Sequence, residues 1–322
     1  MLLKTFIQKW FFRLFTLIVS AMFASGGIAS PAKDAPIAPQ SDPDMVFIAF
    51  GDPQISNYMF KRYPIFQAAC EDFHNNNGSF DALLMAGDIA ENGLAEEYQI
   101  VYDGISGLDC RYIVSQGNHD IRLRSYKQST ERFTSFVNAL NGDDAMKSFR
   151  HTEIVNGYKF IILGADKTAF EANCITDEQL EWLDNEIAAE NGKPVFVVVH
   201  QPLNYTHGLP DTWNSPVETA GGIGKSSEKL ETVLNKHNNV VFITGHLHSG
   251  FGEYSYEKIG NFHSVNLPSL CCNNDFGDYN EHGIGYVVEV SPEKAVFRAR
   301  DFMQGKWVAD CDFSIDFEVR EK

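Results

Sequence analysis

The stretch MVFIAFGDPQ, residues 45–54, joins six apolar residues to two polar residues that commonly bind ligands, Asp52 and Gln54. A short continuous apolar run of this kind predicts a buried β-strand, so the polar residues stand at its carboxyl end. In open α/β sheets, ligands bind beyond the carboxyl ends of the strands. The stretch therefore predicts a strand that ends at a binding site.

The same pattern of an apolar run followed by polar residues recurs four times along the chain. The runs are Ala82–Ala86, Tyr112–Ser115, Val195–Val199 and Val240–Thr244, and the motifs after them are Gly87-Asp88, Gly117-Asn118-His119-Asp120, His200 and Gly245-His246-Leu247-His248. Oxygen and nitrogen donors of these types bind divalent metals. We therefore expect the motifs to converge on one metal site at the strand ends.

Two motifs, one after the first of these strands and one after the last, each place two candidate ligands on either side of one intervening residue. On an extended backbone, residues i and i+2 face the same way, so Asp52 and Gln54 are predicted to point at one ion, and His246 and His248 likewise. Each residue is weak evidence alone, because a single histidine is more often structural and Gly-Asp is a common turn. The set as a whole favours a shared site.

The composition and the order of apolar runs predict one α/β domain. The chain has 322 residues, of which 44% are hydrophobic and 21% charged, enough for a large core. Helices are predicted between the strands, at Tyr63–Asn75, Ala95–Gly104, Ser125–Leu140, Thr176–Glu190 and Ser227–His237. Asn156-Gly157 predicts a hairpin between Ser148–Val155 and Tyr158–Leu163. Later strands are predicted at Phe262–Leu267, Gly285–Val290, Ala295–Asp301 and Asp312–Val319, so we expect two packed sheets with helices outside.

The first 44 residues are predicted to lie outside this domain. Basic residues precede the apolar run Leu14–Ala24 and small residues follow it, which is typical of a secretory signal peptide at residues 1–29. The run is too short to span a bilayer comfortably, which disfavours the alternative reading of an uncleaved anchor. Residues 30–44 hold four prolines and predict an irregular leader, and the domain is expected at residues 45–322. We thus expect an exported protein, periplasmic or secreted, without a stable membrane span after cleavage.

The expected export of the protein bears on the state of its cysteines. An oxidising compartment permits disulfides, and we expect one or two among the six cysteines, with their pairing left open.

The formal net charge of −17 disfavours bulk binding of nucleic acid. A small phosphate ester would have to be captured by local metal charge. The oligomeric state is not indicated by the sequence.

With Asn92 just beyond Asp88, these motifs resemble those of the calcineurin-like metallophosphoesterases over about Met45–Asp301. The resemblance implies a four-layer α/β/β/α sandwich and two divalent metal ions, which we expect to be Mn, Fe, Zn or Mg. It implies Asp52, Gln54, Asp88 and His248 as ligands of the first metal, and Asp88, Asn118, His200 and His246 as ligands of the second. Most members carry histidine at the position of Gln54, and a minority subset shares Asp-Pro-Gln. Glutamine binds only through a neutral oxygen, so the first site is expected to be weaker or tilted toward manganese or magnesium.

The function expected from these features is an exported, metal-dependent phosphohydrolase that cleaves phosphate monoesters or diesters. Two cations activate water, so the nucleophile is expected to be a metal-bridging hydroxide. His119 is expected to stabilise developing charge or protonate the leaving oxygen, and Asp120 to orient its ring. The alternatives are a non-catalytic metal-binding or ligand-binding module with a degraded first site, and a single-metal hydrolase of another bond.

Several weaker signals have a structural reading beside the functional one. Asn92 either supports Asp88 or caps the next helix, and His207 is more simply a loop histidine. Aromatic residues in loops after strands are read first as packing, with nucleoside stacking as the alternative: Trp213, Phe251, Tyr254, Tyr256, Phe276 and Tyr279. The glycine-rich residues 221–226 lack the spacing of a phosphate-binding loop. A covalent nucleophile motif of the form Gly-x-Ser-x-Gly does not occur in the sequence.

Overall fold

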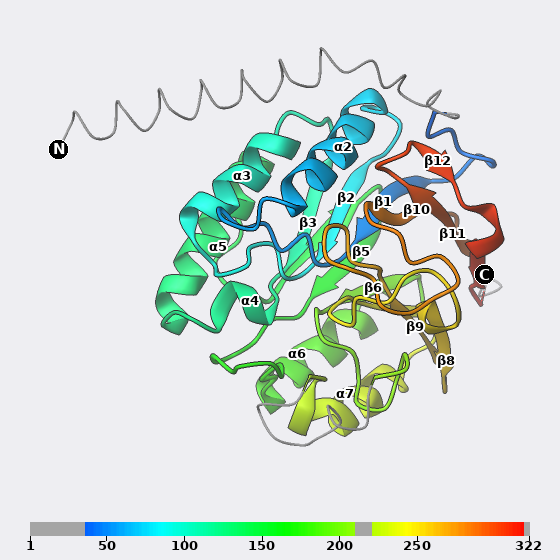
Figure 1. Cartoon of the computed structure of the whole chain (residues 1–322). Helices are drawn as coiled ribbons and strands as arrows, with labels where there is room; N and C mark the ends of the chain where they lie inside the picture. The colour runs from blue at the N-terminus through cyan, green and yellow to red at the C-terminus, as the bar shows by residue number, and fades with distance from the viewer. Residues whose placement is uncertain (1–35, 210–220, 319–322) are drawn as a thin grey trace, which may run out of the picture. The chain divides into compact units, whose positions relative to one another are not determined.

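The computed structural model describes residues 36–209 and 221–318. These residues belong to one compact unit, Asp34–Lys322. Two β-sheets lie face to face in it, and helices cover the outer face of each sheet (Figure 1). The predicted signal peptide, residues 30–35 of the leader and Trp213 lie outside the described residues.

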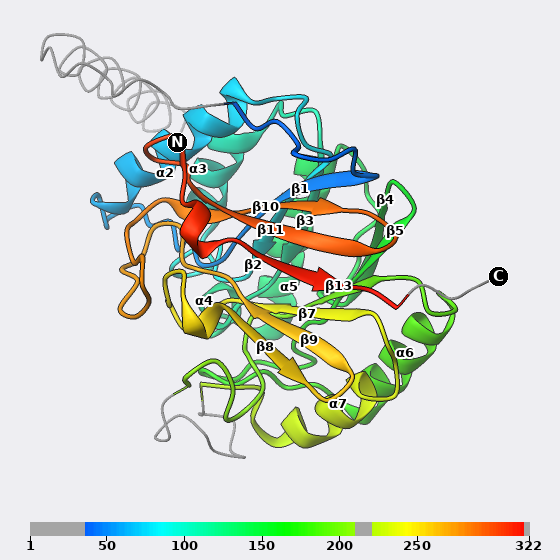
Figure 2. The same ribbon diagram turned by 90° about the vertical axis from the view of Figure 1, so that its right-hand side faces the viewer.

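The first sheet contains the strand that begins the domain. Its strands are β1 (Met45–Phe50), β2 (Ala82–Ala86), β3 (Arg111–Ser115), β10 (Ile284–Val290), β11 (Lys294–Asp301) and β12 (Lys306–Trp307), in the order β12-β11-β10-β1-β2-β3. Strands β1, β2 and β3 are parallel, whereas β10 is antiparallel to β1. Strand β13 (Phe313–Asp316) pairs with β11, beside which it lies in Figure 2. The parallel part therefore carries the first three motifs to one edge.

The second sheet carries the two remaining motifs. Its strands are β4 (His151–Val155), β5 (Tyr158–Ile162), β6 (Val195–Val198), β7 (Val240–Thr244), β8 (Tyr256–Ile259) and β9 (Phe262–Asn266), in the order β4-β5-β6-β7-β9-β8. Strands β5, β6, β7 and β9 are parallel neighbours. The predicted hairpin is confirmed, because Asn156 and Gly157 both have positive φ, as its tight turn requires.

The helices form the two outer layers. They are α2 (Arg62–Asn75), α3 (Ala95–Ile105), α4 (Asn118–Ile121), α5 (Tyr126–Asn141), α6 (Asp177–Ala188) and α7 (Ser227–Leu234), with short 3-10 helices η1 (Gly224–Ser226), η2 (Glu253–Ser255) and η3 (Ala309–Cys311). The side chain of Thr176 accepts a hydrogen bond from the backbone N–H of Gln179 and so caps α6. These bounds confirm the predicted elements to within a few residues.

Alternating side chains of β1 show how the layers pack. Val46, Ile48 and Phe50 join the core beneath α2, α3 and α5, whereas Met45, Phe47 and Ala49 face the second sheet. Between the sheets, the ring of Phe47 contacts those of Phe160 and Phe196 with centroids 5.4 Å apart in each pair. A third core lies between the second sheet and helices α6 and α7. The order helix, sheet, sheet, helix confirms the four-layer prediction.

The described part of the leader is irregular, as predicted, but it is packed against the domain. Ile37 is buried, and its backbone N–H donates to Asn76 Oδ1 at 2.7 Å. Arg298 donates to the backbone oxygen of Ala38 at 2.9 Å. None of the helices in the described residues is long and apolar enough to cross a membrane.

The disulfide prediction is wrong for this structure. No disulfide joins any of the six cysteines, all of which lie in the described residues. Cys70 and Cys271 pack in the core beneath α2, where a thiol behaves as a small apolar side chain. Burial, the main cause, raises the pKa of the Cys70 thiol and keeps it protonated. The three cores already provide the stability for which smaller domains need disulfides.

Candidate metal centre

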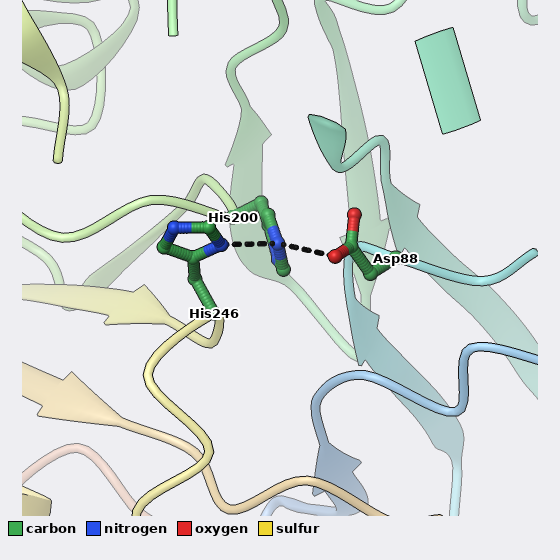
Figure 3. A group of neighbouring side chains, drawn as sticks. All are labelled: Asp88, His200 and His246. Atoms are coloured by element: carbon green, nitrogen blue, oxygen red, sulfur yellow. Dashed lines mark hydrogen bonds and ion pairs between the residues drawn. The ribbon is translucent and has the colours of Figure 1, made fainter. Parts of the chain in front are cut away.

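Three of the predicted ligands from two sheets meet at the strand ends. Asp88 follows β2, His200 follows β6 and His246 follows β7, and one ligand atom of each lies within 4.8 Å of the others. His200 Nε2 lies 3.2 Å from Asp88 Oδ2 and 3.1 Å from His246 Nδ1. Figure 3 shows His200 between the other two side chains, and all three are buried. The predicted convergence is therefore present in the structure.

Asp52 and His248 extend this cluster. His248 Nε2 lies 3.2 Å from Asp52 Oδ1, and His200 Nε2 lies 3.7 Å from the same oxygen. The other oxygen of Asp52 accepts the backbone N–H of His246 at 2.9 Å. Asp52 thus links the two histidines of the Gly-His-Leu-His motif to His200.

Gln54 also reaches the cluster, but with the nitrogen end of its amide. Its Nε2 donates to Asp88 Oδ2 at 2.9 Å, whereas its Oε1 accepts the thiol of Cys272 at 2.6 Å. Only the oxygen of an amide can bind a cation. Gln54 therefore lies where a first-site ligand is expected, but its oxygen, the atom that could bind a metal, is turned toward Cys272.

Asn118 is placed as a ligand of the second site would be. Its Nδ2 donates to Glu171 Oε2 at 2.8 Å, which fixes the orientation of the amide. Its Oδ1 is buried and accepts no hydrogen bond from the residues that the structure describes. A buried oxygen of this kind is costly unless it has a partner, and a cation would be one. The donor set and this oxygen fit the metal site that the resemblance implies.

The backbone at the site is unusual and corrects one prediction. Asp52, Gln54, Asp88, His246 and His248 all have positive φ, between 39° and 75°. Residues other than glycine rarely adopt this left-handed conformation, and each costs about 1 to 3 kcal/mol. The prediction that the ligand pairs lie on extended backbone is therefore wrong. Their side chains converge because the chain turns sharply after β1 and β7, with Pro53 and Leu247 between the ligands.

Two glycines make room for the cluster. A Cβ atom on Gly117 would lie 2.0 Å from Asp88 Oδ1, and one on Gly87 would lie 2.5 Å from the ring of His200. Backbone can approach Asp88 and His200 this closely only without a side chain. The glycines of these two motifs are thus part of the site's geometry.

Burial and neighbouring charges both shift the pKa values of the ionisable side chains at the site. Burial disfavours the charged form of Asp88, but His200 and His119 outweigh it and hold the pKa of Asp88 well below its usual range. Burial likewise opposes the charged form of His200, yet Asp88 and Asp52 raise its pKa to about 10. Burial and the neighbouring His200 lower the pKa of His246 to about 3. The buried carboxylates therefore favour positive charge between them.

His119 lies beside the cluster and is oriented by a residue that the sequence analysis missed. Its Nδ1 lies 2.9 Å from the backbone oxygen of Glu91 and 3.3 Å from the Glu91 carboxylate. Its Nε2 lies 3.8 Å from Asp88 Oδ2. Burial lowers the pKa of His119, but Asp88 and Glu91 raise it to about 9. Glu91 lies three residues after Asp88, and its position in that motif was the available signal.

Asp120 does not orient His119 in the structure, so that prediction is wrong. Its carboxylate accepts the backbone N–H groups of Gly117, Ile89 and Ala90 at 2.8, 3.3 and 3.0 Å, and the hydroxyl of Tyr98 at 3.0 Å. Because it is buried and faces backbone donors, it fastens the loop after β2 to the loop after β3. Its role is to hold these loops in place.

Arg62 and Arg122 surround Glu91 and were also missed. Arg62 forms an ion pair with the Glu91 carboxylate and donates to the backbone oxygen of Gln54 at 2.7 Å. Arg122 Nη2 lies 2.9 Å from His119 Nδ1. Arg62 begins α2 and Arg122 directly follows α4, and the spacing of the two arginines from the motifs gave no signal.

The weaker sequence signals are resolved mainly as structural. Asn92 hydrogen-bonds Glu97 in the first turn of α3, and does not support Asp88. His207 is buried and bonded to the Tyr254 backbone oxygen and to Ser264. Of the loop aromatics, Phe251, Tyr256 and Tyr279 pack on the core between the sheets, while Phe276 remains exposed.

The sequence of the chain matches a known protein family over the segment that contains this site. The sequence model of the calcineurin-like phosphoesterase family matches residues 39–250, which is about two thirds of the chain. The chain belongs to the calcineurin-like phosphoesterases. The match includes every residue predicted as a metal ligand, whereas Cys272 lies beyond it.

The similar curated proteins are phosphodiesterases by name. A 3',5'-cyclic-nucleotide phosphodiesterase of Nostoc is 24% identical over 59% of this chain and 63% of its own length. A probable glycerophosphodiester phosphodiesterase of Arcobacter nitrofigilis is 25% identical over 52% of this chain and 56% of its own. The aligned part thus spans about three fifths of these relatives.

A solved structure shares the fold at low sequence identity. It is a purple acid phosphatase from yellow lupin seeds, with a TM-score of 0.57 and 12% identity. The alignment covers 88% of this chain and 55% of that one. This likeness supports the four-layer fold.

Proposed function

We propose that this protein is an exported, metal-dependent hydrolase of small phosphodiesters. The cluster of Asp88, His200 and His246, with His119 beside it, is the observation that carries the proposal. Membership of the calcineurin-like phosphoesterases gives the reaction class, and the names of the relatives favour diesters over monoesters.

The residues assigned to each metal follow the predicted sets. Asp52, Gln54, Asp88 and His248 would hold the first cation. Asp88, Asn118, His200 and His246 would hold the second cation. When bound, two divalent cations neutralise phosphoryl oxygens and make water a nucleophile at neutral pH.

His119 is positioned to act on the leaving group. In the protonated ring, Nδ1–H donates to the backbone oxygen of Glu91, which leaves Nε2, 3.8 Å from Asp88 Oδ2, to act as the acid. A protonated Nε2 donates to the leaving oxygen as its bond to phosphorus breaks. The Glu91 carboxylate, 3.3 Å from Nδ1, favours the protonated ring that this role requires.

Two exposed aromatic rings favour a substrate with an apolar or aromatic alcohol group, one in contact with Arg122, the neighbour of His119, and one in contact with Asn92, which follows Glu91 in the chain. Phe170 is 56% exposed, and the guanidinium of Arg122 lies 5.4 Å from its ring centroid. Tyr58 is 54% exposed and its hydroxyl accepts the amide of Asn92. Each ring is available to stack on a flat group such as a nucleobase.

Hydrolysis of two chromogenic substrates tests the reaction. We expect manganese-loaded protein to release p-nitrophenol from bis-(p-nitrophenyl) phosphate faster than from the monoester, and chelation to abolish both activities. His119→Ala should keep the metal and lose the activity. Protein that binds two metals but hydrolyses neither substrate would count against the proposal.

The proposal of export rests on the signal-peptide pattern in residues 1–29, and residues 30–322 are divided into a leader and a domain. We propose cleavage after this segment, with residues 30–44 as leader and residues 45–322 as the metallophosphoesterase domain. Expression with and without residues 1–29, followed by fractionation, tests export. The full chain should reach the periplasm or medium at reduced mass, and unprocessed protein in the cytoplasm would refute this part.

The second candidate is a metal-binding module that no longer catalyses hydrolysis. The nitrogen end of Gln54 facing Asp88 is the observation that favours it. Its discriminator is stoichiometry, because it predicts one tightly held metal for each chain and no hydrolysis with any divalent ion.

A further inference from the structure

The amide of Asn118 is held at its nitrogen end only. Its Nδ2 donates to Glu171 Oε2 at 2.8 Å, whereas Oδ1 is buried and accepts no hydrogen bond from the described part of the chain. Asn118 is 1% exposed, so bulk water does not compete for either end. The orientation of this amide therefore depends on Glu171.

A carboxylate holds an amide in one orientation only. Its oxygens accept hydrogen bonds and cannot donate them, so they attract the amide nitrogen and repel the amide oxygen. The backbone N–H of His119 donates to Asp88 Oδ1 at 2.9 Å, which places Asn118 beside the carboxylate that both cations would share. With Nδ2 on Glu171, the free end of the amide is the oxygen, the end that can bind a cation. The observed contact thus favours the orientation that a metal ligand requires.

Glu171 is itself held by residues on two other loops. Arg122 Nη1 lies 3.3 Å from its Oε1, and the other oxygen accepts from Asn118. Gln201 Nε2 donates to the backbone oxygen of Glu171 at 2.8 Å, and Gln201 directly follows His200 in the chain. The carboxylate therefore has a fixed place between the loops that carry two predicted ligands of the second metal.

We propose that Glu171 is a positioning residue that sets the affinity of the second metal site by holding the Asn118 amide with its oxygen toward the metal. The proposal rests on the metal site of the proposed function. An amide turned the other way would remove one ligand and direct N–H groups at the cation, which weakens binding.

Manganese binding, measured by titration with electron paramagnetic resonance and by elemental analysis, tests the inference. We expect Glu171→Ala to weaken one of two manganese equivalents by roughly 10- to 100-fold, the usual cost of losing a residue that orients a ligand. The affected equivalent should be the one that His246→Ala also weakens, and the one that His248→Ala weakens should be unchanged. Circular dichroism and thermal unfolding establish that each variant is folded, and Glu171→Leu serves if the alanine variant does not fold.

Further variants separate the orientation of the amide from the charge of Glu171. Glu171→Gln removes the charge but keeps an oxygen that can accept from Asn118, so it should lose less affinity than Glu171→Ala. In Asn118→Asp protein both ends of the side chain are oxygens, so adding Glu171→Ala should not weaken binding. Glu178→Gln removes a carboxylate whose side chain is 78% exposed and should leave both affinities unchanged.

Three results would overturn the inference. They are equal affinities in Glu171→Ala and the natural protein, an equal loss in Glu171→Gln and Glu171→Ala, and a loss of the same size when Glu171→Ala is added to Asn118→Asp. If the natural protein binds a single manganese ion, the two-metal function is refuted, and the inference stands only if Glu171→Ala weakens the binding of that ion. Two bound ions without phosphodiester hydrolysis would refute the proposed function and leave this inference standing, since the measurement does not depend on turnover.

Discussion

Replacement of Glu91 by glutamine tests how His119 is controlled. The substitution keeps the shape of the side chain and removes a negative charge 3.3 Å from His119 Nδ1. The contact of His119 with the backbone oxygen of Glu91 remains, so the ring should keep its place. The expected change is therefore in the pKa of His119.

The size of this change follows from the geometry. At 3.3 Å, two unit charges interact by about 5 kcal/mol at an effective dielectric constant of about 20. Both side chains are mostly buried but retain 15% and 10% exposure, so solvent screens part of this energy. Neighbouring opposite charges shift pKa values by about 1 to 3 units. We expect the pKa of His119 to fall by about one to two units, or about 1.4 to 2.8 kcal/mol.

The assay is the pH dependence of kcat/KM for bis-(p-nitrophenyl) phosphate with manganese-loaded protein. If protonated His119 is the acid, activity falls as pH rises through its pKa, and Glu91→Gln moves this fall to lower pH. Glu178→Gln is the matched control, since it removes a carboxylate paired with Arg150 at the surface. An unmoved limb in a folded, fully metallated Glu91→Gln variant would refute the reasoning.

Three other substitutions separate catalysis from stability. His119→Ala should lower kcat by about 100- to 10,000-fold without loss of metal, as measured by turnover and elemental analysis in parallel. Asp120→Asn should lower the free energy of unfolding by about 1 to 3 kcal/mol in urea, because it leaves buried backbone donors without a partner. Burial lowers the pKa of His207 below its ordinary value, so its contribution to stability is full above about pH 6.5 and is lost as pH falls. His207→Gln should therefore lose less stability than the natural protein between about pH 7.5 and 5.5, and an equal loss would remove His207 as a cause.

Much of the fold could be predicted because local signals agreed with the tertiary structure. The apolar run Met45–Phe50 forms β1, the Asn156-Gly157 turn forms its hairpin, and Thr176 caps its helix. Continuous apolar runs are typical of strands buried on both faces, and here β1 lies between helices and a second sheet. The disulfide prediction failed because it used the expected compartment and had no information on which thiols are neighbours.

The candidate site could be predicted as a set of residues but not in its geometry. Each predicted ligand follows a strand, so strand prediction alone brought them together. The left-handed backbone at Asp52 and His248 could not be predicted, since sharp turns with non-glycine residues depend on contacts from the rest of the site. The contact of Cys272 with Gln54 joins separate loops, which no spacing along the chain reveals, whereas the only sequence signal for Glu91 was its place three residues after Asp88.

The left-handed backbone at five of the predicted ligand positions has a cost in stability. Each of these residues holds a conformation that glycine or asparagine would adopt at lower energy. A library of variants selected only for resistance to heat should therefore accumulate glycine or asparagine at these positions and lose the capacity to bind metal. Natural selection that retains aspartate, glutamine and histidine there accepts a less durable protein in exchange for its chemistry.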